Sequence, residues 1–362
     1  MLVYYNILYK IMRLLYIYFL KPVLFKFDAE NVHDFFIWIG EELGKYSIGR
    51  RLVSLFYGYS KNDKEVVVDG IIYKSPVILA AGFDYDGRLT EILPSMSFGG
   101  VEVGSVTAKA YSGNDKPRLT RLKNSKSILV NKGLKNEGVD AVISRLGQKK
   151  RRAQGFVIGV SVAQTNCKEN VSEVEGIKDY TSSFKKLVEE NVGDYYTVNI
   201  SCPNAFGGEA FTTPDKLKRL LDSLGQVKTE RPVYVKMPIN LAWNDFKSLL
   251  DVIKFFPYVK GAIVGNLNKE YKYLANQNET PKEYCGGLSG LPTRDLSTEL
   301  IKRTREYCGK DMTIIGCGGI FSPEDAQEKI DAGANLLQLI TGMIYEGPGL
   351  IKNICKEIKY GE

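Results

Sequence analysis

The segment VNISCPN, residues 198–204, places a thiol and two amides at the end of an apparent strand. Its apolar residues alternate as in a β-strand, and the run stops at a proline. Taken singly, a strand-end asparagine usually forms a turn and a buried cysteine is usually inert. A cysteine, Cys202, held between Asn199 and Asn204 instead favours a functional site, because thiols and amides can act together on a polar ligand.

The composition narrows that chemistry. His33 is the only histidine, so histidine-based triads and multi-histidine metal sites are excluded. The six cysteines show no CxxC or zinc spacing, so no metal site is predicted and a reducing cytoplasm is the simplest setting. The net charge of +7 is spread along the 362 residues. This favours a solvated surface over a nucleic-acid groove, with an anionic membrane surface as the other candidate.

Short β-branched runs alternate with amphipathic helical patterns through most of the chain. Eight such runs lie at residues 77–82, 100–107, 156–162, 195–201, 233–238, 261–266, 313–319 and 335–341. Two of the intervening helices open on Thr-Pro or Ser-Pro, which are N-cap signals. Eight strand–helix alternations predict an α/β fold, a (β/α)8 TIM barrel, since a doubly wound sheet would need fewer strands.

In such a barrel the chemistry lies at the C-terminal ends of the strands. Unusual residues gather at those ends in this sequence. They are Ala81, Gly82, Ser105, Ser161, Asn199, Cys202, Asn204, Lys236, Asn266, Gly318, Gly319 and Thr341. A single rim that carries all of them is hard to explain by structure alone, so we expect the active site there.

Two glycine-rich stretches follow the seventh and eighth strands, GCGGIFSPEDA and TGMIYEGPGLIK. Loops at these places lead into helix N-termini and commonly bind phosphate in this fold. Neither a Walker lysine motif nor a GxGxxG after the first strand is present, which argues against a nucleoside triphosphate or a Rossmann-bound dinucleotide. Flavin mononucleotide (FMN) fits, with Lys236 near the isoalloxazine to stabilise the anion formed on reduction.

The first 60 residues differ from the rest and predict a small helical module, with the barrel over residues 61–362. Asn6, Lys10 and Arg13 form one polar stripe on an otherwise apolar and aromatic helix, a pattern typical of a helix that lies in a membrane interface. A core-packing helix and a true span are the alternatives. Two more helices are expected at residues 29–46 and 48–60, and Asp69-Gly70 predicts a type I′ hairpin.

Several long motifs resemble the dihydroorotate dehydrogenases, and the first resembles their membrane-associated, quinone-reducing class. In chain order they are FKFDAENVHDF, AAGFD, VEVGSVTAKAYSGNDKPRLTRL, VNISCPN, GGLSGLP, IIGCGGI and YEGPGLIK. The resemblance covers essentially the whole chain. It implies FMN-dependent oxidation of dihydroorotate to orotate in pyrimidine biosynthesis, a quinone as electron acceptor, and peripheral attachment to the cytoplasmic face of a membrane.

The resemblance also implies a role for each site residue. Cys202 matches the base that removes a proton from C5 of dihydroorotate while C6 delivers hydride to the flavin. The substrate-binding positions are Asn131, Asn199, Asn204, Asn266 and Tyr85. The flavin-binding positions are Ala81, Gly82, Ser105, Ser161, Asn199, Lys236, Gly290, Gly319, Ile340 and Thr341. His33 and Arg121 match positions that line the quinone end.

The sequence departs from the family pattern at a few of these positions. The membrane-associated class normally has serine where this chain has Cys202, and a thiol ionises more readily than a hydroxyl. Tyr85 replaces a substrate-facing lysine, with Asp86 beside it, and Lys132 or Lys135 are the nearest cations that could compensate. Elsewhere Leu267 replaces a hydroxyl residue, Gly265 replaces a flavin-contacting threonine, and the loop NKGLKNEG is one residue short.

Two alternatives to a dihydroorotate dehydrogenase remain open from the sequence. One is a barrel flavoenzyme that acts on RNA, such as a dihydrouridine synthase, which also carries Cys-Pro after a strand-four asparagine and would suit the positive charge. The other is a degenerate flavin-binding protein without turnover, which the changes at Tyr85 and Leu267 motivate.

Overall fold

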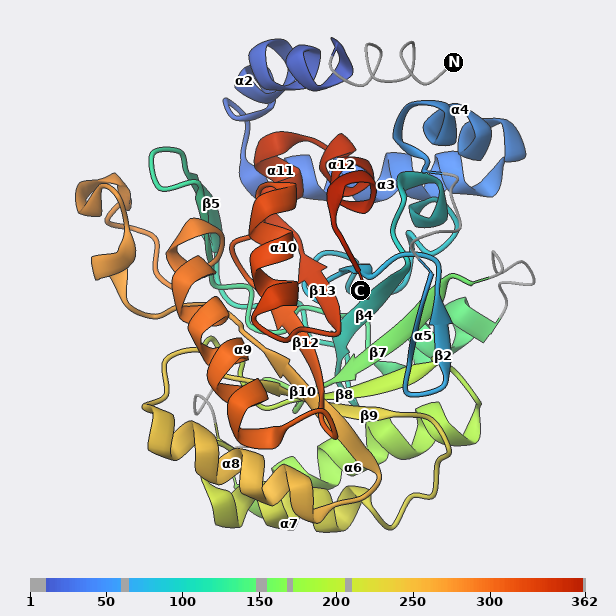
Figure 1. Cartoon of the computed structure of the whole chain (residues 1–362), viewed down its shortest axis with the longest axis vertical. Coiled ribbons are helices and arrows are strands. Elements are labelled where there is room, and N and C mark those ends of the chain that lie inside the picture. Colours follow the sequence, from blue (N-terminus) through green and yellow to red (C-terminus); the bar gives the residue numbers. More distant parts are fainter. Residues whose placement is uncertain (1–10, 60–64, 148–154, 168–171, 206–209, 361–362) are drawn as a thin grey trace.

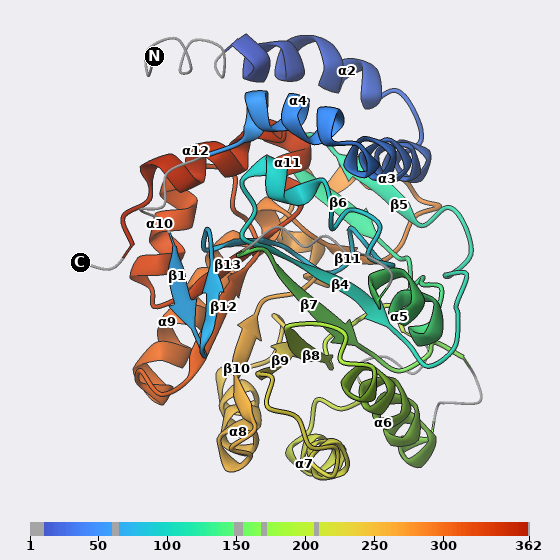
Figure 2. The same ribbon diagram turned by 90° about the vertical axis from the view of Figure 1, so that its right-hand side faces the viewer.

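A computed structural model describes residues 11–59, 65–147, 155–167, 172–205 and 210–360. Eight parallel strands close into a barrel in the order β10-β12-β13-β3-β4-β7-β8-β9 (Figures 1 and 2). They are β3 (Val77–Leu79), β4 (Gly100–Val106), β7 (Val157–Val162), β8 (Tyr195–Asn199), β9 (Val233–Met237), β10 (Val259–Val264), β12 (Thr313–Cys317) and β13 (Leu336–Leu339). Each predicted run is one of these strands, so the predicted TIM barrel is confirmed.

Amphipathic helices surround the barrel because each has an apolar face to bury. They are α5 (Val139–Gly147), α6 (Glu173–Glu189), α7 (Pro214–Leu224), α8 (Trp243–Phe255), α9 (Arg294–Cys308), α10 (Pro323–Asp331), α11 (Thr341–Glu346) and α12 (Gly349–Glu357). Side-chain caps fix two helix starts: Ser172 accepts a hydrogen bond from Glu175 N–H, and Ser322 accepts one from Asp325 N–H. These caps set where the chain turns from a strand end into a helix.

The predicted hairpin closes the N-terminal end of the barrel. Strands β1 (Val66–Val68) and β2 (Ile71–Tyr73) pair antiparallel around Asp69 and Gly70, whose φ angles of 48° and 80° suit a type I′ turn. The carboxylate of Asp69 accepts hydrogen bonds from the Tyr234 hydroxyl at 2.7 Å and the Thr313 hydroxyl at 2.8 Å. With this end plugged, only the rim of C-terminal strand ends remains open for a site.

A second, three-stranded sheet lies beside the barrel and was not predicted. It is ordered β11-β6-β5, from β5 (Leu119–Leu122), β6 (Ser127–Val130) and β11 (Gly287–Leu288). Val130 pairs with Gly287 across β6 and β11, which brings Asn131 beside the segment that precedes Gly287. The short β11 is 157 positions further along the chain, so no local pattern marks this pairing.

The N-terminal helices lie together at one end of the molecule, beside α11 and α12 (Figures 1 and 2). Residues 11–24 are helical and end in α2 (Lys21–Leu24), and α3 (Ala29–Lys45) and α4 (Ser47–Tyr57) confirm the other two predicted helices. Asn6, Lys10 and the proposed boundary at residue 60 lie outside the described residues.

The polar side of the first helix faces the barrel helix α11. Arg13 forms an ion pair with Glu346 at 2.6 Å, the Tyr16 hydroxyl donates to the Ile344 carbonyl at 2.6 Å, and Lys21 donates to the Tyr345 carbonyl at 3.0 Å. Arg13, a member of the predicted polar stripe, is therefore committed to the protein instead of to a lipid headgroup.

The N-terminal helices and their connections carry most of the large apolar side chains that are exposed in the described structure. Tyr18 and Phe19 are 68% and 69% exposed, and Ile48 of α4 is 78% exposed. The others are Ile11, Leu14, Leu15, Leu20, Val23, Phe27, Phe35, Phe36, Trp38, Tyr46, Leu52 and Leu55. We call this set the apolar face. Within the described residues, no helix is long and apolar enough to cross a bilayer.

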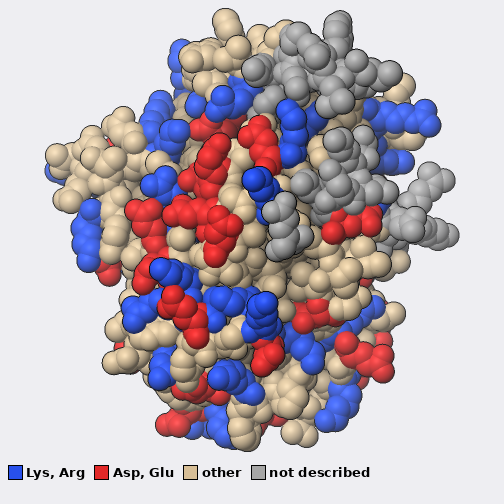
Figure 3. Space-filling model, viewed as in Figure 1, with Lys and Arg blue, Asp and Glu red and all other residues tan. Residues whose placement is uncertain are grey.

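Charges on the side of the molecule shown in Figure 3 alternate in sign over the lower half, where Lys and Arg lie next to Asp and Glu. An acidic group gathers nearer the middle of the same view. A groove for nucleic acid would show a continuous positive stripe, and this side shows none among the described residues. On this side, the positive charges are therefore interspersed with negative ones.

Candidate active site

The end of β8 holds the first group of predicted site residues. Asn199 is buried, and its amide donates to the Ser105 hydroxyl at 2.8 Å. Ser105 and Ser161 are joined in turn by a 2.8 Å hydrogen bond between their hydroxyls. Across the β8–β9 pair, Asn199 is the register partner of Lys236. The barrel therefore brings together four of the predicted residues from four strands.

Asn266 joins this group through Ser201. The Asn266 amide donates to the Ser201 carbonyl at 2.8 Å and to its hydroxyl at 2.6 Å, and Ser201 N–H and hydroxyl both donate to the Asn199 side-chain oxygen. The Tyr180 hydroxyl donates to the Asn199 carbonyl at 2.6 Å. The backbone that leads to the thiol is thus fixed from both sides.

Cys202 follows directly and lines a small hollow together with Asn199, Asn166 and Tyr180. Its residue is partly exposed, and none of the six cysteines is in a disulfide. A thiol at a partly open strand end, next to amides, can take a proton from a ligand seated on the rim.

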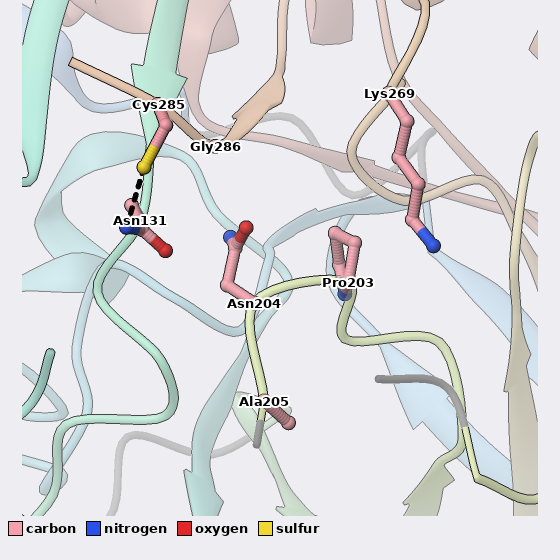
Figure 4. A pocket seen from close by; sticks show the side chains of 7 residues that line it. All are labelled: Asn131, Pro203, Asn204, Ala205, Lys269, Cys285 and Gly286. Carbon is pink, nitrogen blue, oxygen red and sulfur yellow. Dashed lines mark hydrogen bonds between the residues drawn. The ribbon is translucent and has the colours of Figure 1, made fainter. Parts of the chain in front are cut away.

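A second pocket, of about 400 Å³, is lined by Asn131 and by Asn204 of the turn that follows Cys202 (Figure 4). The Asn204 amide donates to the Val130 carbonyl at 2.8 Å, which ties the turn to the sheet strand that precedes Asn131. The Asn131 amide lies 3.1 Å from the Cys285 sulfur. Figure 4 shows the Lys269 side chain on the far side of Pro203 from these two amides. The pocket thus offers amides and one ammonium to a polar ligand.

Asn114 links the two asparagines and was missed from the sequence. Its amide donates to the Asn131 side-chain oxygen and to the Asn204 carbonyl, both at 3.0 Å. Its own side-chain oxygen accepts from the Tyr111 hydroxyl at 2.8 Å and from the Asn166 amide at 3.0 Å. The sequence SGNDKP around it indicates only a turn, so its central place depends on tertiary contacts.

Inside the barrel, Lys236 belongs to a buried polar network. Its ammonium lies 3.3 Å from Gln338 Oε1 and 3.7 Å from Glu102 Oε1. Gln338 donates to Glu102 Oε2 at 2.8 Å, and the Thr197 hydroxyl does so at 2.9 Å. Glu102 Oε1 has no hydrogen-bond partner in the described structure. This network was not predicted, although Glu102 stands within the motif VEVGSVT.

The loops predicted to bind phosphate meet at the rim. Gly290 approaches Thr341 so closely that a Cβ on the glycine would lie 2.9 Å from the Thr341 methyl group, and the hydroxyls of Ser289 and Thr341 are 2.8 Å apart. A Cβ on Gly319 would collide with Arg294. Only glycine fits at these two positions, and the loops that follow β11, β12 and β13 therefore pack tightly against one another.

The same rim leaves room for a flat ring. Gly82 is exposed with a φ of +103°, and a Cβ there would meet only the Ile340 side chain, at 4.0 Å. Ala81 is partly exposed beside it. Open backbone at Gly82, the glycine-rich loops after β12 and β13 and the buried cation Lys236 together fit a flavin cofactor.

Tyr85 and Asp86, which differ from the family pattern, have defined contacts in the structure. The Asp86 carboxylate accepts from Glu137 N–H at 2.9 Å, at the start of the segment that leads to α5. Lys132 places its ammonium 5.0 Å from the centre of the Tyr85 ring. Both cations named from the sequence lie near this position: Lys132 faces the Tyr85 ring, and the charge of Lys135 opposes the burial that raises the pKa of the Tyr85 hydroxyl. Burial lowers the pKa of Lys132, and its ammonium has no hydrogen bond in the described structure.

Gly265 and Leu267 are explained by packing. Gly265 has a φ of +119°, and a side chain there would collide with the Cys317 carbonyl. Leu267 packs against Gly287 of β11, where any Cβ would contact its side chain. Gly265 and Leu267 therefore both suit the path that the backbone takes after β10.

His33 and Arg121 connect the N-terminal helices to the barrel. His33 Nε2 lies 2.8 Å from the Phe83 carbonyl, and its ring packs at 5.4 Å from the Tyr85 ring. Arg121 donates to the Phe27 carbonyl at 3.0 Å and lies over the Phe25 ring at 4.8 Å. Helix α3 therefore reaches the loop that follows Gly82, which is the loop of the predicted flavin site.

In the described part of the chain, no group of three or more His, Cys, Asp or Glu side chains is placed to hold a metal. The site offers amides, hydroxyls, the thiols of Cys202 and Cys285, and buried ammonium groups. This set suits acid–base work on an organic ligand beside an organic cofactor.

Comparisons with known proteins agree with this architecture. The model of the family "Dihydroorotate dehydrogenase" matches residues 64–360. A protein of Christiangramia forsetii named dihydroorotate dehydrogenase (quinone) is 38% identical, over 94% of this chain and 97% of its own. One of the same name from Nostoc punctiforme is 36% identical, over 94% and 93%. A crystal structure of DHODH from Eimeria tenella in complex with ferulenol aligns with a TM-score of 0.79 at 26% identity, over 91% of this chain and 90% of the other.

With this barrel, the family match makes the protein a flavin-dependent oxidoreductase. The matches extend over nearly the whole chain at above 30% identity. The chain belongs to the dihydroorotate dehydrogenase family.

Asp86 generates a prediction about pH and stability. Burial raises the pKa of its carboxyl from 3.8 to about 6, so the ionised form destabilises the fold above that pH. We expect Asp86→Asn to raise Tm by about 2–4 °C at pH 8. The gain should shrink between about pH 6 and pH 4, where the native carboxyl becomes protonated. Calorimetric scans across this range, with exposed Asp311→Asn as control, measure it. An equal effect of both variants at every pH would contradict the assignment.

Proposed function

We propose that this protein oxidises dihydroorotate to orotate, with FMN as its bound cofactor and a membrane quinone as the final electron acceptor. One observation supports the proposal most directly. The end of β8 places Cys202 between buried Asn199, which is linked to Ser105 and Ser161, and Asn204, which reaches the strand before Asn131. One turn thus connects the proposed flavin side to the proposed substrate side.

In this proposal the asparagines hold the pyrimidine ring and Cys202 accepts the proton from C5. Amide groups can pair with the ring N–H and C=O groups, and they add no charge that would oppose removal of the proton. The thiol ionises several pKa units more easily than the serine of the quinone class, so it needs no separate activating base. Lys132 and Lys269 are the cations near enough to balance the substrate carboxylate.

Ala81, Gly82, Ser105, Ser161, Lys236, Gly290, Gly319, Ile340 and Thr341 would hold FMN. When bound, FMN supplies the hydride acceptor of the reaction. The glycine-rich loops near Gly290 and Gly319 would receive its phosphate. Lys236, whose ammonium is buried between Gln338 and Glu102, would provide positive charge to the reduced ring.

Residues 1–60 would form a membrane-associating module and residues 61–362 the catalytic barrel. The apolar face suits partial insertion into one leaflet, with attachment at the cytoplasmic face of a membrane. A quinone could then leave the lipid between these helices near His33 and Arg121, where α3 contacts the loop at Phe83.

Purified protein should be yellow and release one FMN per chain after acid treatment. Dihydroorotate should bleach the flavin without oxygen, and a soluble quinone should restore the colour. Stopped-flow absorbance at the flavin band, followed by chromatography of the released cofactor, measures both. Recovery of a dinucleotide would refute the cofactor, and a flavin that dihydroorotate leaves oxidised would favour a binding protein without turnover.

Replacing the proposed base separates proton transfer from cofactor binding. Cys202→Ala should keep FMN bound but slow flavin reduction by about 10²–10⁴-fold. Cys202→Ser should retain part of the activity with its pH optimum moved upward, because a hydroxyl ionises less readily. Cys308→Ala, a buried thiol at the end of α9, is the matched control. Reduction of Cys202→Ala at the parent rate would show that another group is the base.

The apolar face makes a separate prediction about membranes. The double variant Tyr18→Ser and Phe19→Ser should bind liposomes about 100-fold more weakly, since each aromatic ring contributes about 1.5 kcal/mol or more when buried. Phe255→Ser on α8 is the control, because Phe255 is 68% exposed and α8 lies at the end of the molecule opposite α2 (Figure 1). Cosedimentation with anionic vesicles measures binding. Equal losses in both proteins would mean that the apolar face is not the membrane contact.

A further inference from the structure

Helix α3 places one buried carboxylate against the segments that flank β5 and β6 of the small sheet. Glu30 is 3% exposed, and its oxygens accept hydrogen bonds from the Arg118 guanidinium at 2.7 and 3.0 Å. Lys135 lies 3.4 Å away and Lys132 lies 3.7 Å away. Burial alone would raise the pKa of Glu30, but these cations outweigh it and bring the pKa to about 2. Glu30 is therefore a fixed anion at neutral pH.

Arg118 connects Glu30 to the pocket lined by Asn131 and Asn204. Its guanidinium donates to the Asn114 carbonyl at 2.6 Å and to the Ser112 carbonyl at 2.9 Å. The Arg118 carbonyl accepts from Asn131 N–H at 2.8 Å. The same residue thus holds the backbone of Asn131 and of Asn114, whose side chain bonds to Asn131 and to the Asn204 backbone.

Lys132 is a second route from Glu30 to the same pocket. It follows Asn131 in the chain and is 3% exposed, so its side chain is confined between Glu30 and the Tyr85 ring. A buried ammonium without hydrogen bonds depends on a nearby anion for its position. Loss of the Glu30 charge would leave exposed Asp34 as the remaining carboxylate near the buried cations Lys132 and Arg118.

We propose that Glu30, a residue of the N-terminal helices, is a positioning residue for the substrate pocket, acting through Arg118 and Lys132 on Asn114 and Asn131. The proposal rests on the assignment of that pocket to dihydroorotate and orotate. It makes the N-terminal helices part of the substrate half-reaction as well as of the quinone half-reaction. Its consequence is that a change on α3 alters affinity for orotate without touching the ligand.

Helix α3 provides its own matched control. Glu41 also joins the helix to the barrel through an arginine, at 2.7 Å from Arg88 Nε, but that contact leads to the segment after the Phe83–Asp86 loop and to no asparagine of the pocket. Glu30→Gln and Glu41→Gln each remove one carboxylate from a helix–barrel ion pair. A merely structural role predicts similar outcomes for the two variants.

The experiment is titration calorimetry of orotate into the oxidised, flavin-loaded full-length protein. Glu30→Gln should raise the Kd of orotate about 3- to 30-fold, the range typical of residues that act through a packed network. Glu41→Gln should leave it within about twofold of the parent. Steady-state kinetics should show the same split, with KM for dihydroorotate raised in Glu30→Gln and KM for the quinone unchanged. Glu30→Asp, which keeps the charge, should restore part of the affinity.

Three results would overturn the proposal: an unchanged orotate Kd in Glu30→Gln, equal weakening in both variants, or no recovery in Glu30→Asp. If Glu30→Gln does not fold, Arg118→Lys replaces it, because that variant keeps the charge but loses the two-pronged contact. Its orotate Kd should rise by a similar factor, and an unchanged value would be equally decisive. Failure of the parent protein itself to bind orotate would refute the proposed function and is visible before any variant is tested.

Discussion

Closure of the parallel barrel is the constraint on which the rest of the structure depends. Because all eight strands run the same way, their C-terminal ends meet on one rim. Closure between β13 and β3 brings Ile340 to Gly82, although these residues stand near opposite ends of the sequence. The Asp69 hairpin blocks the other end of the barrel. Any ligand that needs the strand ends must therefore approach from the side covered by the N-terminal helices and the small sheet.

The barrel interior contains a buried ion pair, Glu102 and Lys236, where apolar side chains would avoid the free-energy cost of desolvating two charges. Glu102 is fully buried, its nearest cation is 3.7 Å away, and one of its oxygens lacks a hydrogen bond in the described structure. Isolated buried ion pairs of this kind seldom stabilise a fold compared with apolar residues. The pair of Glu102 and Lys236 is better explained by a role in the site. Glu102 balances the charge of Lys236 and keeps this cation at a fixed place beside Asn199.

The sequence predicts the parts whose signal is local. The β-branched runs predict all eight barrel strands, and Asp69-Gly70 predicts the hairpin because its turn needs positive φ at both residues. The small sheet and Asn114 escape prediction because their partners lie far along the chain, as in the pairing of Val130 with Gly287. The polar stripe on the first helix was predicted, but its partner was not: Arg13 contacts Glu346 of α11. Periodicity shows that a helix has two faces, and only tertiary contacts decide which one packs.

At Tyr85 the positive charge near the site comes from Lys132 on another segment of the chain. An aromatic ring cannot replace an ammonium, but its face attracts one, and Lys132 lies over the ring at 5.0 Å. Lys116, Arg118, Lys132 and Lys135 surround the carboxylates of Glu30 and Asp34, so this corner keeps a surplus of positive charge. That surplus suits an anionic substrate. It also makes the pocket depend on α3, because the anion that keeps these cations in place belongs to the N-terminal helices. In the proposed function, Lys132 would supply the positive charge that a lysine in the barrel loop supplies in the family, and Glu30 of the N-terminal helices would hold Lys132 in place.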